Sequence, residues 1–104
     1  MEKLIRDGQV AVIYSPGFGA GWYSWNNVHY GEDLIFDPVL AAYIDEGKMD
    51  EAKTYVTMRF PEAYRGCVED LVVQLIPEGT AFRIHEYDGS ESIEIKDKMD
   101  WVVA

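Results

Sequence analysis

Hydrophobic positions along the chain form short runs that are bounded by turn-forming residues. Residues 10–14 are consecutive apolar positions, and Asp7-Gly8 separates them from the shorter segment 3–6. An Asp-Gly pair readily adopts the positive φ angles that a two-residue hairpin turn needs. The pattern therefore predicts an N-terminal β-hairpin whose second strand is buried on both faces.

A second Asp-Gly pair, Asp88-Gly89, lies near the other end of the chain. The flanking segments 82–87 and 90–95 alternate apolar and polar residues with a period of two. This period is typical of strands that have one face on a core and the other in water. A second β-hairpin is predicted here.

Two helices are predicted between the hairpins. Asp37 is a good N-cap for a helix whose first position is Pro38, and Gly47 follows its expected end. A second helix is expected to start at Asp50 and to stop before Pro61, because proline cannot continue a helix.

The remaining apolar runs predict two more strands, at 71–76 and 101–103. The order of strands, helices and strands predicts an α+β fold, with an antiparallel sheet built from the N-terminal and C-terminal hairpins and two central helices packed on it. A length of 104 residues is enough for one core, so we expect one domain over residues 1–104.

Residues 15–27 interrupt these patterns with three glycines, one proline and several large rings. The segment lacks the Gly-Lys-Ser/Thr of a phosphate loop and the spacing of a dinucleotide fingerprint. It is either a tight turn in which glycines make room for packed rings, or a loop whose rings stack on a base while glycine N–H groups meet a phosphate. The second interpretation gives four candidate ligand-binding residues: Phe18, Gly19, Gly21 and Trp22.

The charge balance narrows the possible partners. Nineteen acidic residues oppose nine basic ones, for a net charge of -10, which argues against binding to nucleic acid or to an anionic membrane surface. No segment has the length of a membrane span, no signal peptide is evident, and the single Cys67 fits a reducing compartment, so we expect a cytoplasmic protein. One cysteine and two histidines do not suffice for a zinc cluster. A carboxylate site for a hard cation stays open, but the second hairpin offers few ligands for one, and we expect neither a metal nor a cofactor.

Arginines and polar turn residues complete the candidate site. A doubly charged ligand approaching so acidic a protein has to meet arginines that gather in one place, contributed by one subunit or by two. For any single arginine, a surface ion pair with one of the many carboxylates is the plainer interpretation. For the hairpin residues, the plainer interpretation is that they stabilise the turn itself. The candidate ligand contacts are Arg59, Arg65 and Arg83 for phosphates, and Glu86, Asp88 and Ser90 for ribose hydroxyls or an amine.

Catalytic residues are not predicted. His85 and Glu86 are adjacent on a strand and therefore face opposite sides of a sheet. Ser15 and Ser24 lack a nucleophile-elbow motif, and Cys67 has no obvious basic activator. We therefore expect a binding protein and not an enzyme.

Residues 15–25 and 82–92, about half the chain together with the first hairpin, resemble a phage-encoded family, the first-described type of Thoeris anti-defence sponge proteins. The resemblance implies an α+β protein that forms homodimers or higher assemblies and sequesters cyclic ADP-ribose isomers without cleaving them. Some relatives also bind cyclic oligonucleotides elsewhere in a hexamer. The resemblance assigns ligand contacts to Glu86, Asp88 and Ser90 and to the basic and aromatic residues that face them.

Two functions therefore stand as hypotheses. The first is an anti-defence sponge that acts in the host cytoplasm as a homo-oligomer, a dimer or a hexamer, and hides a cyclic nucleotide immune signal. The alternative is an acidic protein-binding inhibitor or nucleic-acid mimic whose carboxylates occupy a basic groove of a host defence enzyme.

Overall fold

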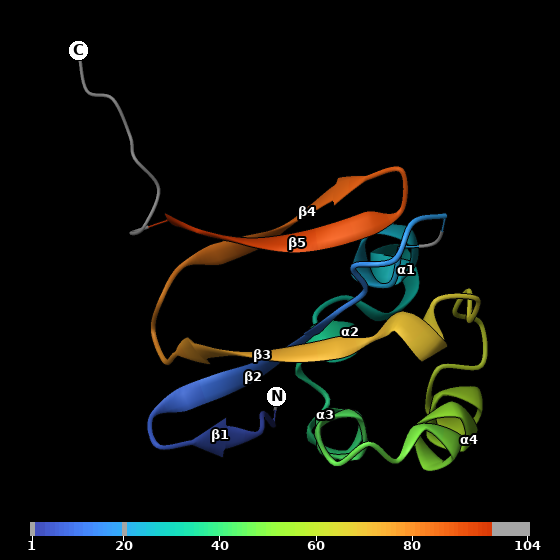
Figure 1. Ribbon diagram of the computed structural model, residues 1–104, viewed down its shortest axis with the longest axis horizontal. Coiled ribbons are helices and arrows are strands. Elements are labelled where there is room, and N and C mark those ends of the chain that lie inside the picture. Colours follow the sequence, from blue (N-terminus) through green and yellow to red (C-terminus); the bar gives the residue numbers. More distant parts are fainter. Residues whose placement is uncertain (1, 20, 97–104) are drawn as a thin grey trace.

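The computed structural model describes residues 2–19 and 21–96. The α+β class predicted from the sequence is confirmed (Figure 1). The predicted strand at 101–103 lies outside the described residues. In chain order the elements are β1 (Ile5–Arg6), β2 (Gln9–Tyr14), α1 (Tyr23–Tyr30), α2 (Asp33–Phe36), α3 (Pro38–Asp45), α4 (Met49–Arg59), a single 3-10 turn (Val68–Asp70), β3 (Val72–Pro77), β4 (Phe82–Tyr87) and β5 (Ser90–Ile95).

The strands divide into two sheets, where the sequence had suggested a single one. β2 is the centre of a three-stranded antiparallel sheet in the order β1-β2-β3, with Val10 opposite Ile76. β4 and β5 pair only with each other. Their hairpin lies on the opposite side of the β1-β2-β3 sheet from α3 and α4 (Figure 1). It packs its apolar face on that sheet and does not extend the sheet edge.

β2 is buried on both faces, as its uninterrupted apolar run predicted. Ala11 and Ile13 point into a core shared with α3, α4 and the segment that follows them. Val10 and Val12 point the other way, into a second core with α2 and the β4–β5 hairpin. Because successive side chains of a strand alternate between faces, a strand between two cores needs apolar residues at every position.

Both predicted Asp-Gly turns are present. Asp7 and Gly8 have φ angles of 51° and 77°, and Asp88 and Gly89 have φ angles of 50° and 84°. These left-handed conformations match the right-handed twist of the paired strands, which explains why the two-residue connections close tightly.

The two predicted helices are confirmed as α3 and α4. Asp37 caps α3 with Oδ1, which accepts hydrogen bonds from the N–H groups of Val39 and Leu40, both at 3.0 Å. Gly47 follows the helix with a φ of 75°, and α4 ends before Pro61. Of the helices that the structure describes, none is long and apolar enough to cross a membrane.

Candidate functional site

The glycine- and aromatic-rich loop and the second hairpin are far apart in sequence and adjacent in space. The N–H of Gly19 donates to the carbonyl of Asp88 at 2.8 Å. The hydroxyl of Ser90 donates to the carbonyl of Pro16 at 2.7 Å. These bonds fasten the tip of the loop to the β4–β5 turn, beside the start of α1 (Figure 1). Two of the sequence-predicted site segments therefore form one surface.

A third segment, residues 64–70, borders this surface. The ring of Tyr64 packs on the ring of Trp25 with centroids 5.5 Å apart. A Cβ atom added to Gly17 would lie 2.5 Å from Oδ2 of Asp70, so the loop passes directly against this segment. The glycine at position 17 is explained by this close approach, since a larger residue would displace Asp70.

Glu91 holds these parts together from inside. Its side chain is 1% exposed. Oε1 accepts a hydrogen bond from the N–H of Ser15 at 3.0 Å, and Oε2 accepts from both the N–H and the hydroxyl of Ser24 at 2.8 Å. A buried carboxylate is stable only when its oxygens are satisfied in this way.

The same contacts explain why α1 exists where no helix was predicted. Its N-cap residue is Trp22, which makes no side-chain capping bond. Glu91 supplies the missing acceptor from a distant strand, and its negative charge lies at the positive end of the helix dipole. Residues 15–27 were expected to be irregular throughout, and the structure corrects this from Tyr23 onward.

Sequence reasoning did not single out Glu91, although a signal was available. On β5, Glu91 shares one strand face with Ile93 and Ile95, the apolar residues that pack on the second core. A carboxylate at a core-facing position is unusual and points to a specific set of donors.

Cys67 lies in the core behind this junction and is fully buried. Burial raises the pKa of its thiol to about 12, and the negative charge of Glu91 acts in the same direction. The thiol therefore stays protonated at neutral pH, which makes Cys67 a poor nucleophile.

Four aromatic rings around the junction are open to solvent. Phe18 and Tyr87 are each 73% exposed, Tyr64 is 54% exposed and Trp25 is 45% exposed. Such rings provide flat apolar faces on which a planar base can stack. Of these four residues, only Phe18 was a candidate ligand contact from the sequence.

Trp22 is a correction to the predicted site. It is fully buried, its Nε1 donates to the carbonyl of Leu34 at 2.7 Å, and its ring packs edge-on against Phe60. It is a core residue and has no free face for a ligand. Gly21 is buried too, and a Cβ added there would lie 2.8 Å from Cδ1 of Trp25, so its role is to allow close packing.

The three candidate arginines do not gather within one chain. Arg59 on α4 pairs with Asp33 at 3.1 Å, and Arg83 on β4 pairs with Glu94 at 2.6 Å. They line different cavities, of about 250 and 280 Å³ respectively. Arg65 is exposed and has no ion pair in the part of the chain that the structure describes.

The polar residues of the second hairpin differ in what they offer to a ligand. The carboxylate of Glu86 accepts a hydrogen bond from the N–H of Gly89 at 2.7 Å, and the hydroxyl of Ser90 donates a hydrogen bond to the carbonyl of Pro16 in the loop. Both groups therefore stabilise the local structure. The exposed carboxylate of Asp88 has no hydrogen-bond partner among residues 2–19 and 21–96. It is the open acceptor of the three.

The described residues contain no cluster of three or more His, Cys, Asp or Glu side chains that could hold a metal ion. Comparisons with protein-family models, with curated proteins and with solved structures found no match to this chain. The loop, the hairpin and the 64–70 segment are therefore the features from which a function can be inferred.

Proposed function

We propose that this protein is a non-enzymatic binder that sequesters a cyclic nucleotide signal, as its resemblance to the Thoeris sponge proteins implies. The observation that supports this most is the junction of three segments, which carries four exposed aromatic rings. Phe18 and Tyr87 are carried on the two turns that the Gly19–Asp88 hydrogen bond joins. Rings held on a rigid junction lose little entropy when a base stacks on them.

The polar groups at the junction suit the sugar and the phosphates of such a ligand. The free carboxylate of Asp88 is an acceptor for ribose hydroxyls. Arg65 follows Tyr64, whose ring contacts Trp25, so it is the candidate arginine closest along the chain to the exposed rings. We assign phosphate binding to Arg65, because Arg59 and Arg83 are engaged in ion pairs elsewhere.

A second copy of the chain is part of this proposal. A sponge has to bind at about nanomolar Kd, or roughly -12 kcal/mol, to compete with a receptor for a scarce signal. Ligands bound this tightly are enclosed on most of their surface. Phe18 and Tyr87, each 73% exposed in one chain, cannot by themselves enclose a ligand. A partner subunit can cover the ligand from the other side and can contribute further arginines.

Calorimetry of the purified protein against cyclic ADP-ribose isomers and cyclic di- and trinucleotides tests the proposal. At least one ligand should bind with sub-micromolar Kd and be recovered intact by mass spectrometry. Arg65→Ala and Phe18→Leu should each weaken binding about tenfold or more, since each removes a direct contact. Arg6→Ala is the matched control, because Arg6 pairs with Asp45 on α3 and should leave the affinity unchanged.

Three results would count against the proposal. If no nucleotide in the panel binds, the sponge function is excluded for these ligands. Product formation during incubation would indicate an enzyme. The acidic inhibitor would be favoured if the protein bound a host defence protein tightly, with an affinity that falls steeply with added salt and does not change in Arg65→Ala.

A further inference from the structure

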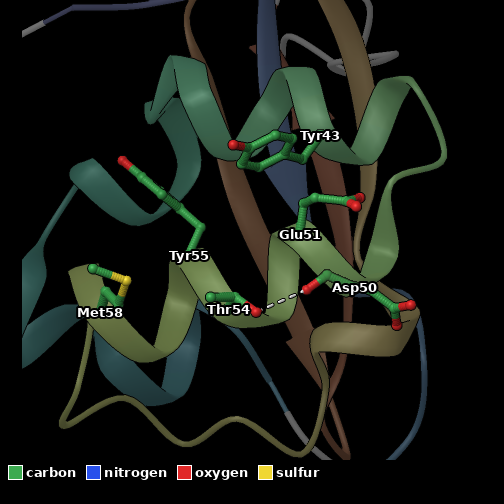
Figure 2. Close-up of a pocket in the computed structure, with 6 residues that line it drawn as sticks. All are labelled: Tyr43, Asp50, Glu51, Thr54, Tyr55 and Met58. Atoms are coloured by element: carbon green, nitrogen blue, oxygen red, sulfur yellow. Dashed lines mark hydrogen bonds between the residues drawn. The ribbon is translucent and has the colours of Figure 1, made fainter.

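A cavity of about 330 Å³ lies on the far side of the molecule from the second hairpin, between α3 and α4. Tyr43 enters it from α3, and α4 supplies all the other lining side chains (Figure 2). This cavity shares no residue with the candidate site described above. It is lined by Tyr43, Asp50, Glu51, Thr54, Tyr55 and Met58.

The walls of the cavity are aromatic and polarizable. The rings of Tyr43 and Tyr55 are arranged edge to face with centroids 6.1 Å apart. The hydroxyl of Tyr55 donates to Oδ2 of Asp37 at 2.7 Å, which fixes its ring, and the Met58 side chain is largely exposed at the rim. The faces of tyrosine rings carry negative potential and attract cations.

Two acidic residues line the same cavity. Glu51 lies next to Tyr43, whereas the carboxylate of Asp50 points away from both tyrosine rings (Figure 2). Neither forms an ion pair among the residues that the structure describes, although Lys53 attracts Asp50 at longer range. The basic side chains of this region are held elsewhere: Lys48 by Glu46, Lys53 by Glu69 and Arg59 by Asp33.

We infer that this cavity binds a small organic cation, an alkylammonium or guanidinium group with a short apolar body. Aromatic faces and the unpaired carboxylate of Glu51 both attract positive charge, and the apolar parts of the rings and of Met58 suit methyl or methylene groups. The volume is at the lower end of the range of ligand pockets, which restricts the ligand to a small molecule or one side chain. This inference does not depend on the proposed nucleotide binding.

Nuclear magnetic resonance of protein labelled with ¹³C in the methionine methyl groups provides a direct test. The Met58 methyl signal is identified by its loss in Met58→Leu. Titration with tetramethylammonium or methylguanidinium should shift this signal with a saturable Kd of about 1–10 mM, as expected for a shallow charged site. The neutral analogues tert-butanol and methylurea should shift it much less at equal concentration.

Variants of the lining residues separate the contributions of charge and of the ring. Glu51→Gln should weaken cation binding about threefold to fivefold, whereas Glu78→Gln, at an exposed turn before β4, should leave it unchanged. Tyr43→Leu should weaken binding by a similar factor because it removes the aromatic face, and Tyr43→Phe should retain most of it. Thermal unfolding of each variant checks that it is folded.

The source of the cation is decided by a third probe. Capped arginine, with both backbone ends blocked, should bind as well as methylguanidinium if the site receives a side chain of another protein, and more weakly if it receives a free metabolite.

Two results would overturn the inference. One is a neutral analogue that shifts Met58 as strongly as its cation, and the other is a folded Glu51→Gln or Tyr43→Leu protein with unchanged affinity for both cations.

Discussion

The two β-hairpins have the same Asp-Gly turn and nearly the same φ angles, but they are attached to the protein in different ways. In the first hairpin, β2 passes between two cores, and its side chains from Val10 to Ile13 are buried. In the second, β4 is mostly exposed, and only one face contacts the rest of the molecule. Hydrogen bonds made by Glu91, Ser90 and Asp88 then fix its tip.

This difference shows that turn chemistry and burial are decided separately. An Asp-Gly pair determines that two strands pair and in which register. The number of apolar faces determines whether the hairpin becomes the core or lies on it. A hairpin that is held by one apolar face and by a few polar contacts at its tip is a suitable place for a binding surface, because its exposed residues do not have to maintain the core.

The largest effect is expected from truncating the core hairpin. Ile13→Ala should lower the free energy of unfolding by about 4 kcal/mol, because Ile13 is fully buried and the change leaves a cavity. Ile93→Ala on β5, which is only partly buried, should lower it by about 1 kcal/mol. Urea denaturation measures both values, and equal losses would contradict the proposed difference between the hairpins.

Glu91→Gln should have the next largest effect, a loss of about 3 kcal/mol. One carboxylate oxygen becomes an amide group that faces the N–H donors of Ser15 or Ser24. Hydrogen exchange should show faster exchange of β4–β5 and α1 amides. Glu94→Gln on the same strand is the control, and it should change stability by no more than about 0.5 kcal/mol because its partner Arg83 is exposed. A Glu91→Gln protein as stable as the parent would show that this carboxylate does not hold the junction.

Alanine at the turn glycines provides a finer comparison. Gly8→Ala and Gly89→Ala each place a Cβ atom on a residue with positive φ, which strains the turn by about 1–2 kcal/mol. In the first hairpin the strain should appear in global unfolding by urea. In the second it should appear mainly as faster local hydrogen exchange of β4 and β5. If both variants affect only global unfolding, the two hairpins form one cooperative unit.

The smallest effect is expected from alkaline pH. The pKa of Cys67 is raised from 9.0 to about 12, so its stabilising contribution is complete below pH 9 and is lost as the pH rises through 12. The pKa of Tyr55 is raised from 10.0 to about 12 by burial and by its hydrogen bond to Asp37. Ionisation of Tyr55 therefore also lowers the stability of the folded protein as the pH rises. Between pH 8 and pH 10 the loss due to Cys67 should be about 1 kcal/mol by urea denaturation. Cys67→Ala should abolish the part of this loss that is due to the thiol. An unchanged pH dependence in this variant would contradict the assignment of that loss to Cys67.

Local signals were sufficient for most of the secondary structure. Asp7-Gly8 and Asp88-Gly89 located both hairpins, and Asp37 with Gly47 bounded α3. α1 could not be predicted in this way, because its N-terminus is capped by Glu91 from a strand far along the chain. The division into two sheets could not be predicted from the sequence either, because the hydrophobic pattern of a strand does not indicate which sheet face a later hairpin will cover.

The candidate site was predicted only in part. The loop and the second hairpin were both identified, and the structure brings them together through Gly19 and Asp88. Trp22 was assigned to the ligand but belongs to the core, because ring exposure depends on which way the loop turns. Arg59 and Arg83 pair with nearby carboxylates, which was the plainer interpretation for any single arginine, and the gathering of arginines from two subunits stays a prediction.

The amino-acid sequence by itself determined the turns, the strand that is buried on both faces, and the ends of α3 and α4, because each of these depends on residues within a few positions of one another. Only the tertiary structure decided that the glycine-rich loop meets the second hairpin, that Glu91 is the buried acceptor between them, and that two tyrosines and two carboxylates line a cavity between α3 and α4. These features depend on donors, rings and charges from distant segments, and such groups acquire their partners only when the chain has folded.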